Sequence, residues 1–325
     1  MKRICILCVA MIMATLSYAQ INLVATLNHN DSISVYYGSS ALGQAYNNAV
    51  GGDIITLSGG TFSSVNISKA ITIRGAGMIS DDIAGTDLTN ITGSFTINIQ
   101  DDSINYFTLE GVNANVQIIT QSAYKPKFIK CRLGQVKDGT NSFTEAKFIN
   151  CIMNSISSSM TQTQFINTII LNFGYYNPIS SFYNCIVKTY NTNHTFYNSI
   201  LYVEGVNNGT RNLSNSSSFN CIGINMYAGS GAYFSSQAHN CVNYYGMSSV
   251  FQSFTGEFAY SFELQDSVAS TVLGTDGTQV GVYGGEFPFD IRVTNPMIKR
   301  INVANRSTAD GKLSVDIEVV SEEEQ

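Results

Sequence analysis

The feature that most constrains the fold of this chain is a short pattern that recurs through its middle. Each copy has a phenylalanine, a polar residue two positions later, then a small residue and, two positions further on, an apolar one. Five copies follow this form closely: Phe128–Leu133, Phe148–Met153, Phe165–Ile170, Phe182–Val187 and Phe196–Leu201. The spacing between copies varies, as it does in stacked β-coils, because each coil can carry a loop of its own length.

The phase of the pattern predicts a corner in each coil. Side chains on one face of a strand recur every two residues, but Phe148 and Cys151 are three apart. Two short strands therefore meet at Asn150, a residue type that tolerates left-handed backbone and could form a ladder with its neighbours. Corners are predicted at Gly59, Gly75, Asn90, Gly111, Lys130, Asn150, Asn167, Asn184, Asn198, Asn220 and Asn240. The predicted fold is an all-β, right-handed parallel β-helix of about eleven coils.

The cysteines share one place in this repeat. Cys131, Cys151, Cys185, Cys221 and Cys241 directly follow predicted corners, as do Thr168 and Ser199. We interpret them as a column of small side chains pointing into a narrow core, with buried free thiols. Disulfides between adjacent coils, Cys131 with Cys151 or Cys221 with Cys241, remain the alternative.

The two ends of the repeat carry different patterns. Apolar residues recur with helical period over Ala41–Val50, which predicts a short helix over the open N-terminal core. Residues 298–304 and 312–320 alternate with period two around the turn Ala309–Gly311, which predicts a β-hairpin that caps the last coil or docks on a partner. The predicted organisation is a signal peptide (1–19), an N-terminal strand and capping helix (20–52), the β-helix (53–287) and the hairpin segment (288–325).

The N-terminal twenty residues read as a secretory signal. Lys2 and Arg3 precede the apolar run Ile4–Leu16, and small residues stand at positions 17 and 19. We expect an exported protein, periplasmic, outer-surface or extracellular, with no transmembrane segment in the mature chain. Loss of the two basic residues changes the formal net charge of −6 to −8, which argues against a nucleic-acid partner.

Two segments carry a family resemblance. Residues 41–77, with a helix followed by Gly52-Asp53, Gly60-Thr61-Phe62 and Ile71-Thr72-Ile73, resemble the start of pectin-lyase-like right-handed β-helix proteins. Residues 262–285 are similar to the closing coil of uncharacterised β-helix proteins secreted by Bacteroidetes. The resemblance implies the fold but not an activity, because the superfamily includes lyases, hydrolases, esterases and adhesins.

The residues able to do chemistry are few and scattered. A basic patch of Lys125, Lys127, Lys147 and Arg132 could hold an acidic sugar, or could be an ordinary solvated face. No pair of carboxylates and no His or Cys spacing predicts a catalytic centre, a metal site or a cofactor.

The residues just before the corners form an outward column that becomes aromatic toward the C-terminus. Its candidate ligand-binding members are Tyr183, Tyr197 and Phe219, with Tyr175 and Tyr176 in a nearby loop. Exposed aromatic rings can stack on sugars, unless a loop or the C-terminal segment covers them.

The leading hypothesis is a non-catalytic, adhesin-like module that binds a glycan or another surface polymer. The alternatives are a polysaccharide lyase or glycoside hydrolase, and a purely structural surface rod.

Overall fold

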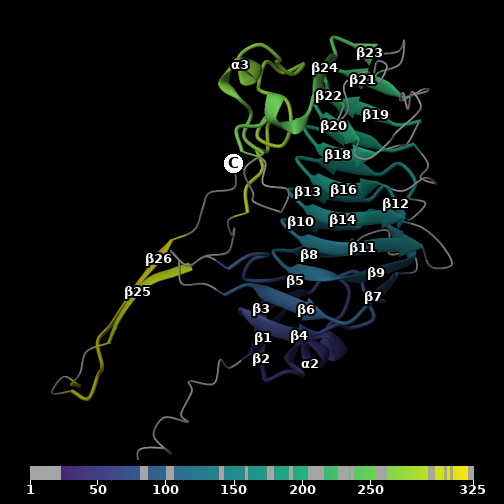
Figure 1. Cartoon of the computed structure of the whole chain (residues 1–325). Helices are drawn as coiled ribbons and strands as arrows, with labels where there is room; N and C mark the ends of the chain where they lie inside the picture. Colours follow the sequence, from purple (N-terminus) through teal and green to yellow (C-terminus); the bar gives the residue numbers. More distant parts are fainter. Residues whose placement is uncertain are drawn as a thin grey trace, which may run out of the picture.

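The structure is a computed structural model, and it describes residues 23–80, 87–99, 106–138, 143–157, 160–173, 179–189, 193–203, 216–225, 234, 238–253, 262–291, 297–303, 306–307 and 310–320. Two sheets, A and B, run along one axis and are built mainly from parallel strands of successive turns (Figure 1). The predicted all-β parallel β-helix is therefore confirmed.

Each turn gives one strand to sheet A and the next to sheet B. In spatial order, sheet A contains β2 (Ser32–Tyr37), β1 (Val24–His29), β3 (Ile54–Leu57), β5 (Thr72–Arg74), β8 (Thr108–Glu110), β10 (Lys127–Ile129), β13 (Lys147–Ile149), β15 (Gln164–Ile166), β17 (Ser181–Tyr183), β19 (Thr195–Tyr197), β21 (Ser217–Phe219) and β23 (Ala238–His239). Sheet B contains β4 (Gly60–Ser63), β6 (Thr89–Thr92), β9 (Asn113–Tyr124), β11 (Arg132–Asp138), β14 (Ile152–Ser157), β16 (Ile169–Phe173), β18 (Ile186–Thr189), β20 (Ile200–Val203), β22 (Ile222–Asn225) and β24 (Val242–Tyr245), with β7 (Phe95–Asn98) and β12 (Phe143–Thr144) also paired to β9.

Eight of the eleven predicted corners have the left-handed backbone that the parity slip requires, whereas Gly59, Gly75 and Asn90 do not. Lys130 and the corner asparagines have φ between 44° and 52°: Asn150, Asn167, Asn184, Asn198, Asn220 and Asn240. A second left-handed column, which the sequence analysis did not predict, precedes the strands of sheet A and includes Lys125, Glu145, Gln162 and Asn193. Each turn is thus closed by backbone geometry that only some residue types adopt at low cost.

The solenoid has fewer turns than the eleven predicted. Its regular part, with a non-glycine left-handed corner after each strand of sheet A, has about seven turns. Wider turns with glycine corners precede it. Asn90 was predicted as a corner, but it lies inside β6 and pairs with Asn113 of β9. The prediction failed because the segment between Gly75 and Gly111 forms one wide coil rather than two narrow ones.

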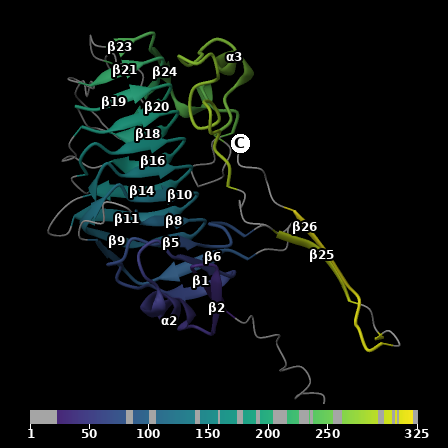
Figure 2. The same cartoon turned by 180° about the vertical axis from the view of Figure 1, so that it is seen from behind.

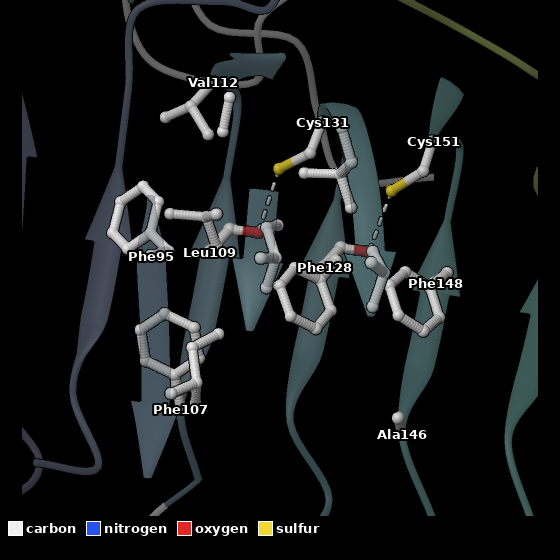
Figure 3. Close-up of a cluster of buried hydrophobic side chains, with 14 of the residues drawn as sticks. Phe95, Phe107, Leu109, Val112, Phe128, Cys131, Ala146, Phe148 and Cys151 are labelled. Carbon is white, nitrogen blue, oxygen red and sulfur yellow. Dashed lines mark hydrogen bonds between the residues drawn. The ribbon is translucent and has the colours of Figure 1, made fainter. Parts of the chain in front are cut away.

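The interior is a stack of phenylalanines beside a column of small hydrogen-bond donors (Figure 3). Phe128, Phe148, Phe165, Phe182 and Phe196 stack with centroid distances of 4.7–5.1 Å. The thiols of Cys131 and Cys151 each donate at 3.3 Å to a carbonyl of the preceding coil. All five described cysteines are free, as predicted. Four of them are buried, but Cys241 in the last coil is only partly buried, which differs from the prediction. Thr168 and Ser199 fit the same column because their hydroxyls also donate to carbonyl groups.

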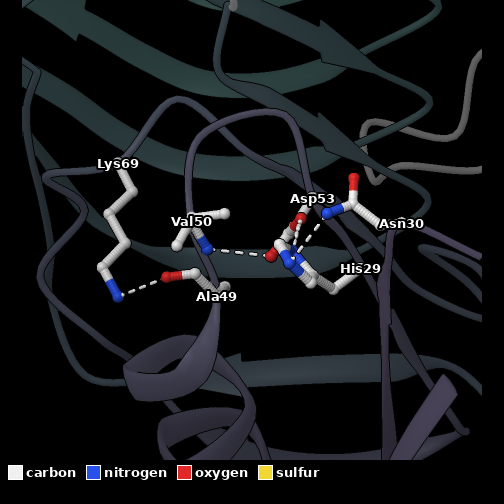
Figure 4. Close-up of polar contacts among 6 residues, drawn as sticks. All are labelled: His29, Asn30, Ala49, Val50, Asp53 and Lys69. Carbon is white, nitrogen blue, oxygen red and sulfur yellow. Dashed lines mark hydrogen bonds and ion pairs between the residues drawn. The ribbon is translucent and has the colours of Figure 1, made fainter. Parts of the chain in front are cut away.

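The N-terminal end is closed by helix α2 (Ala41–Asn48), which buries Ala41, Leu42, Ala45 and Tyr46 and confirms the predicted helix. Lys69 donates to three carbonyls at the end of this helix, where carbonyl groups lack helical partners (Figure 4). The buried carboxylate of Asp53 accepts from the Val50 N–H and lies 2.8 Å from His29 Nδ1. These polar contacts tie the C-terminal end of the helix to Lys69, and the loop that follows the helix to the end of β1.

Residues 262–291 lie along the outside of the solenoid. This segment contains α3 (Asp266–Ala269) and lies beside the corner column, and η1 (Met247–Ser249) directly follows β24 (Figure 2). Asn167 and Asn220 donate to carbonyls of this segment at Val282 and Leu273, and Asn198 accepts from the Thr275 N–H. Residues 262–285, whose sequence resembles a closing coil, therefore lie on the flank of the solenoid, where corner asparagines hold them by hydrogen bonds.

Glycine allows this close approach. Gly285 has φ of +80°, and a Cβ there would lie 2.8 Å from Asn184 Oδ1. Beneath the segment, the outward isoleucines after the small-residue column are buried against Val272, Val280 and Val282; these are Ile152, Ile169, Ile186, Ile200 and Ile222. The C-terminal segment therefore forms a second apolar core on the outer face of the solenoid.

The predicted C-terminal hairpin is present as β25 (Met297–Val303) and β26 (Val315–Val320), which pair antiparallel. It stands away from the solenoid in both views (Figures 1 and 2). The expectation that it caps the last coil is therefore wrong. No helix in the described part of the chain is long and apolar enough to cross a membrane.

Candidate functional site

The outer face of sheet A carries the aromatic column that the sequence predicted. Tyr183, Tyr197, Phe219 and His239 occupy equivalent places on four neighbouring strands. Their rings stack one on the next, with centroid distances of 5.1, 4.9 and 4.9 Å and planes within 10°. The two tyrosines and Phe219 are half-buried, and His239 is exposed. Tyr175 and Tyr176 lie outside the described residues.

Three isoleucines continue this column toward the N-terminus. Ile129, Ile149 and Ile166 are in register with Tyr183 on adjacent strands, and each is half-buried. We call the seven residues from Ile129 to His239 the ridge. Within its aromatic part the ring faces pack on one another, so a ligand lying along sheet A would meet ring edges. Stacking of a sugar on a broad ring face is therefore confined to the ends of the column.

A polar column runs beside the ridge, two residues earlier on each strand. Its members are Thr108, Lys127, Lys147, Gln164, Ser181, Thr195 and Ser217. Lys127 and Lys147 are both exposed and are directly opposite each other on β10 and β13. The two lysine ammonium groups repel each other because they are cross-strand neighbours, and a carboxylate between them would offset this repulsion.

The structure divides the predicted basic patch. Lys127 and Lys147 share the outer face of sheet A, whereas Arg132 begins β11 of sheet B, beyond the corner at Lys130. Lys125 lies at the opposite corner, 3.4 Å from the carboxylate of Glu145. A hydrogen bond with Tyr124 raises the pKa of Lys125, and Glu145 adds to the effect.

Two tyrosines beside Lys125 were missed by the sequence analysis. The Lys125 ammonium lies 4.7 Å from the ring centroid of Tyr124 and 5.8 Å from that of Tyr106. The two rings meet edge to face at 6.1 Å. Positions 106 and 124 are about one coil apart, which was the available signal, but both lie outside the five regular copies of the repeat.

The described carboxylates near sheet A are engaged in ion pairs. Glu110 lies 2.9 Å from Arg74, Glu145 pairs with Lys125, and Asp290 lies 3.8 Å from Lys130. Among the described residues, no group of three or more His, Cys, Asp or Glu side chains could hold a metal ion. The outer face of sheet A thus carries a polar column, an exposed lysine pair and the ridge side by side.

No protein-family model, curated protein or solved structure matches this chain. The fold is therefore assigned at the level of the parallel β-helix, from its own strand order and corner geometry.

Proposed function

We propose that this protein is a non-catalytic module that binds an extended glycan along the outer face of sheet A. The observation that carries the proposal is the ridge, which crosses seven consecutive strands and has no fully buried member. A continuous apolar strip beside a polar one suits a chain of sugars, which offers both apolar ring surfaces and hydroxyl groups.

The exposed lysine pair favours an acidic glycan. Lys127 and Lys147 lie next to the isoleucine end of the ridge, so a carboxylated sugar could meet both cations while its neighbours contact Ile129 and Ile149. The sequence resemblance to pectin-lyase-like β-helices and to secreted Bacteroidetes proteins supports an extracellular polymer as the ligand. The predicted signal peptide supports the same compartment.

A glycan array probed with the chain lacking residues 1–19 tests the proposal. We expect binding to acidic polysaccharides that weakens in Tyr183→Ala, in Tyr197→Ala and in the double variant Lys127→Ala/Lys147→Ala. Tyr183→Phe and Tyr197→Phe keep the ring stack and show whether the hydroxyl groups contribute. Tyr245→Ala is the matched control, because Tyr245 is 56% exposed on β24 of sheet B, away from the ridge.

Two results would contradict the proposal. Absence of binding to every glycan on the array would reject glycan binding itself. Unchanged binding in both tyrosine-to-alanine variants would place the ligand elsewhere on the protein. Thermal melts of each variant separate a lost contact from a lost fold.

A further inference from the structure

Two strands of this protein present strongly exposed apolar strips that nothing in the described structure covers. On β2, Ile33, Val35 and Tyr37 are 67%, 45% and 65% exposed. On and just before β26, Leu313, Val315 and Ile317 are 51%, 50% and 52% exposed. In each strip the three side chains are two residues apart. Ile33, Val35 and Tyr37 lie on one face of β2, and Val315 and Ile317 lie on one face of β26, which Leu313 precedes by two positions.

The strip on β2 lies at the end of sheet A. Ile33, Val35 and Tyr37 are opposite Asn28, Thr26 and Val24 of β1, and β2 is the outermost strand of the sheet. Natural edge strands of this kind usually carry a charge, a proline or a bulge that prevents association. The β2 sequence, Ser-Ile-Ser-Val-Tyr-Tyr, has neither a charge nor a proline.

The strip on β26 belongs to an isolated hairpin. Strands β25 and β26 pair only with each other, and they stand clear of the solenoid in both views (Figures 1 and 2). A two-stranded sheet is marginally stable in water unless a further element covers its apolar face. The hairpin and β2 therefore each have an apolar face without a covering element, and within one chain the two faces are apart.

We propose that the hairpin of one copy packs its Leu313, Val315 and Ile317 face on the Ile33, Val35 and Tyr37 face of a second copy. The strips match in length and in residue spacing, since each has three apolar side chains at two-residue intervals. Face-to-face packing buries both strips, whereas edge-to-edge pairing would leave both in water. The occupant is a second copy because the chain's own hairpin does not reach β2 in this structure.

The proposed contact joins the β2 strip of one copy to the hairpin strip of another. Because the two surfaces differ, only two kinds of assembly can bury both. Two copies that exchange hairpins reciprocally form a closed dimer, the smallest assembly that leaves neither strip exposed. Copies that each pass the hairpin to the next one form an open chain. In either case association depends equally on β2 and on the hairpin.

Sedimentation equilibrium tests this inference on three proteins, all lacking residues 1–19. They are the parent chain, the single variant Val35→Lys and the single variant Val315→Lys. We expect the parent protein to self-associate in the micromolar range. Each variant should be at least about ten-fold weaker in self-association, because a charge enters an apolar contact. Mixing the two variants should restore a complex, since Val35→Lys keeps an intact hairpin and Val315→Lys keeps an intact β2. Val50→Lys, at a position 50% exposed outside both strips, is the control.

The mixing experiment separates the alternatives. Self-association that survives in Val315→Lys would show that β2 strips pair with each other, and survival in Val35→Lys would show that hairpins do. Either result overturns the proposal, as does a parent protein that stays monomeric at all concentrations, or a mixture that fails to associate.

Discussion

The side-chain amide of Asn167 donates a 2.8 Å hydrogen bond to the carbonyl oxygen of Val282, 115 positions further along the chain. The same amide donates at 2.7 Å to Gly284. Asn167 also has the left-handed backbone of its corner, with φ of 44°. One residue therefore turns the coil and holds the C-terminal segment on the flank of the solenoid.

Glycine substitutions separate these two roles, because glycine keeps the left-handed backbone but loses the amide. We expect Asn167→Gly to lower the free energy of unfolding by about 1–3 kcal/mol more than Asn150→Gly, since it leaves two buried carbonyls without their donor. Asn150 is a buried corner residue with φ of 52° and is the matched control. Urea denaturation measures the difference. Equal losses in the two variants would show that the amide of Asn167 adds nothing beyond the corner.

Phe165 is central to the interior stack, between Phe148 at 5.1 Å and Phe182 at 4.8 Å. Phe165→Ala should cost about 3–5 kcal/mol, because it removes a fully buried ring and leaves a cavity between two others. Phe165→Leu, which fills more of the space, should cost clearly less. Chemical denaturation checks both, and equal losses would mean that ring packing is not the source of the stability.

Ser218 stands where the preceding turns have phenylalanine. It is in register with Phe196, is buried, and its hydroxyl has no hydrogen-bond partner in the described part of the structure. Ser218→Ala should raise the free energy of unfolding by about 1 kcal/mol, because it removes a buried polar group that is not satisfied. A lower midpoint of thermal unfolding would indicate a partner for this hydroxyl.

His194 links stability to pH. Burial among Phe173, Phe182 and Phe196 lowers the pKa of His194 from 6.5 to about 4. Above pH 6.5 the neutral ring has no effect on the pH dependence. As the pH falls from 6.5 toward 4, the unfolded chain takes up a proton that the folded one does not, so stability is lost.

Between pH 7 and pH 4.5 this residue should account for a loss of about 2–3 kcal/mol. The variant His194→Gln cannot titrate at this position. Between pH 7 and pH 4.5 its free energy of unfolding, measured by urea denaturation, should therefore fall by that much less than the free energy of unfolding of the parent protein. The same pH dependence in both proteins would exclude His194 as its source.

The five described thiols should differ sharply in reactivity. Burial raises the pKa of the Cys185 thiol to about 12, and burial also raises the pKa of Cys131 and Cys221. Cys241 is only partly buried, and a hydrogen bond with Cys221 lowers its pKa. In the chain lacking residues 1–19, which has only these five thiols, a thiol reagent at pH 8 should therefore modify Cys241 in the native protein and the others only after unfolding. Cys241→Ser should abolish the fast reaction, and a second fast thiol in that variant would contradict the assignment.

Much of the solenoid could be predicted from the sequence because its order is local. The three-residue step from Phe148 to Cys151 implies a corner, and the structure has a left-handed residue at Asn150. The small residues after the corners could be assigned to the interior for the same reason. The corner at Asn90 was predicted wrongly, since the wide coil around it lacks the regular spacing of the later repeats.

The outer surface could be predicted only in part. Alternation placed Tyr183 and Tyr197 outside, but it could not show that their faces stack on each other at 5.1 Å. The predicted basic patch also grouped Arg132 with Lys127, although the corner between them places the two residues on different sheets.

The sequence by itself determined the repeat, its corners, the helix over the N-terminal end and the C-terminal hairpin, because each depends on residues close together in the chain. Only the tertiary structure decided where residues 262–291 lie, and that the outward isoleucines from Ile152 to Ile222 form a second core beneath them. The physical reason is distance along the chain. The bond from Asn167 to Val282 and the burial of Ile200 against Gly281 depend on segments that no local pattern relates.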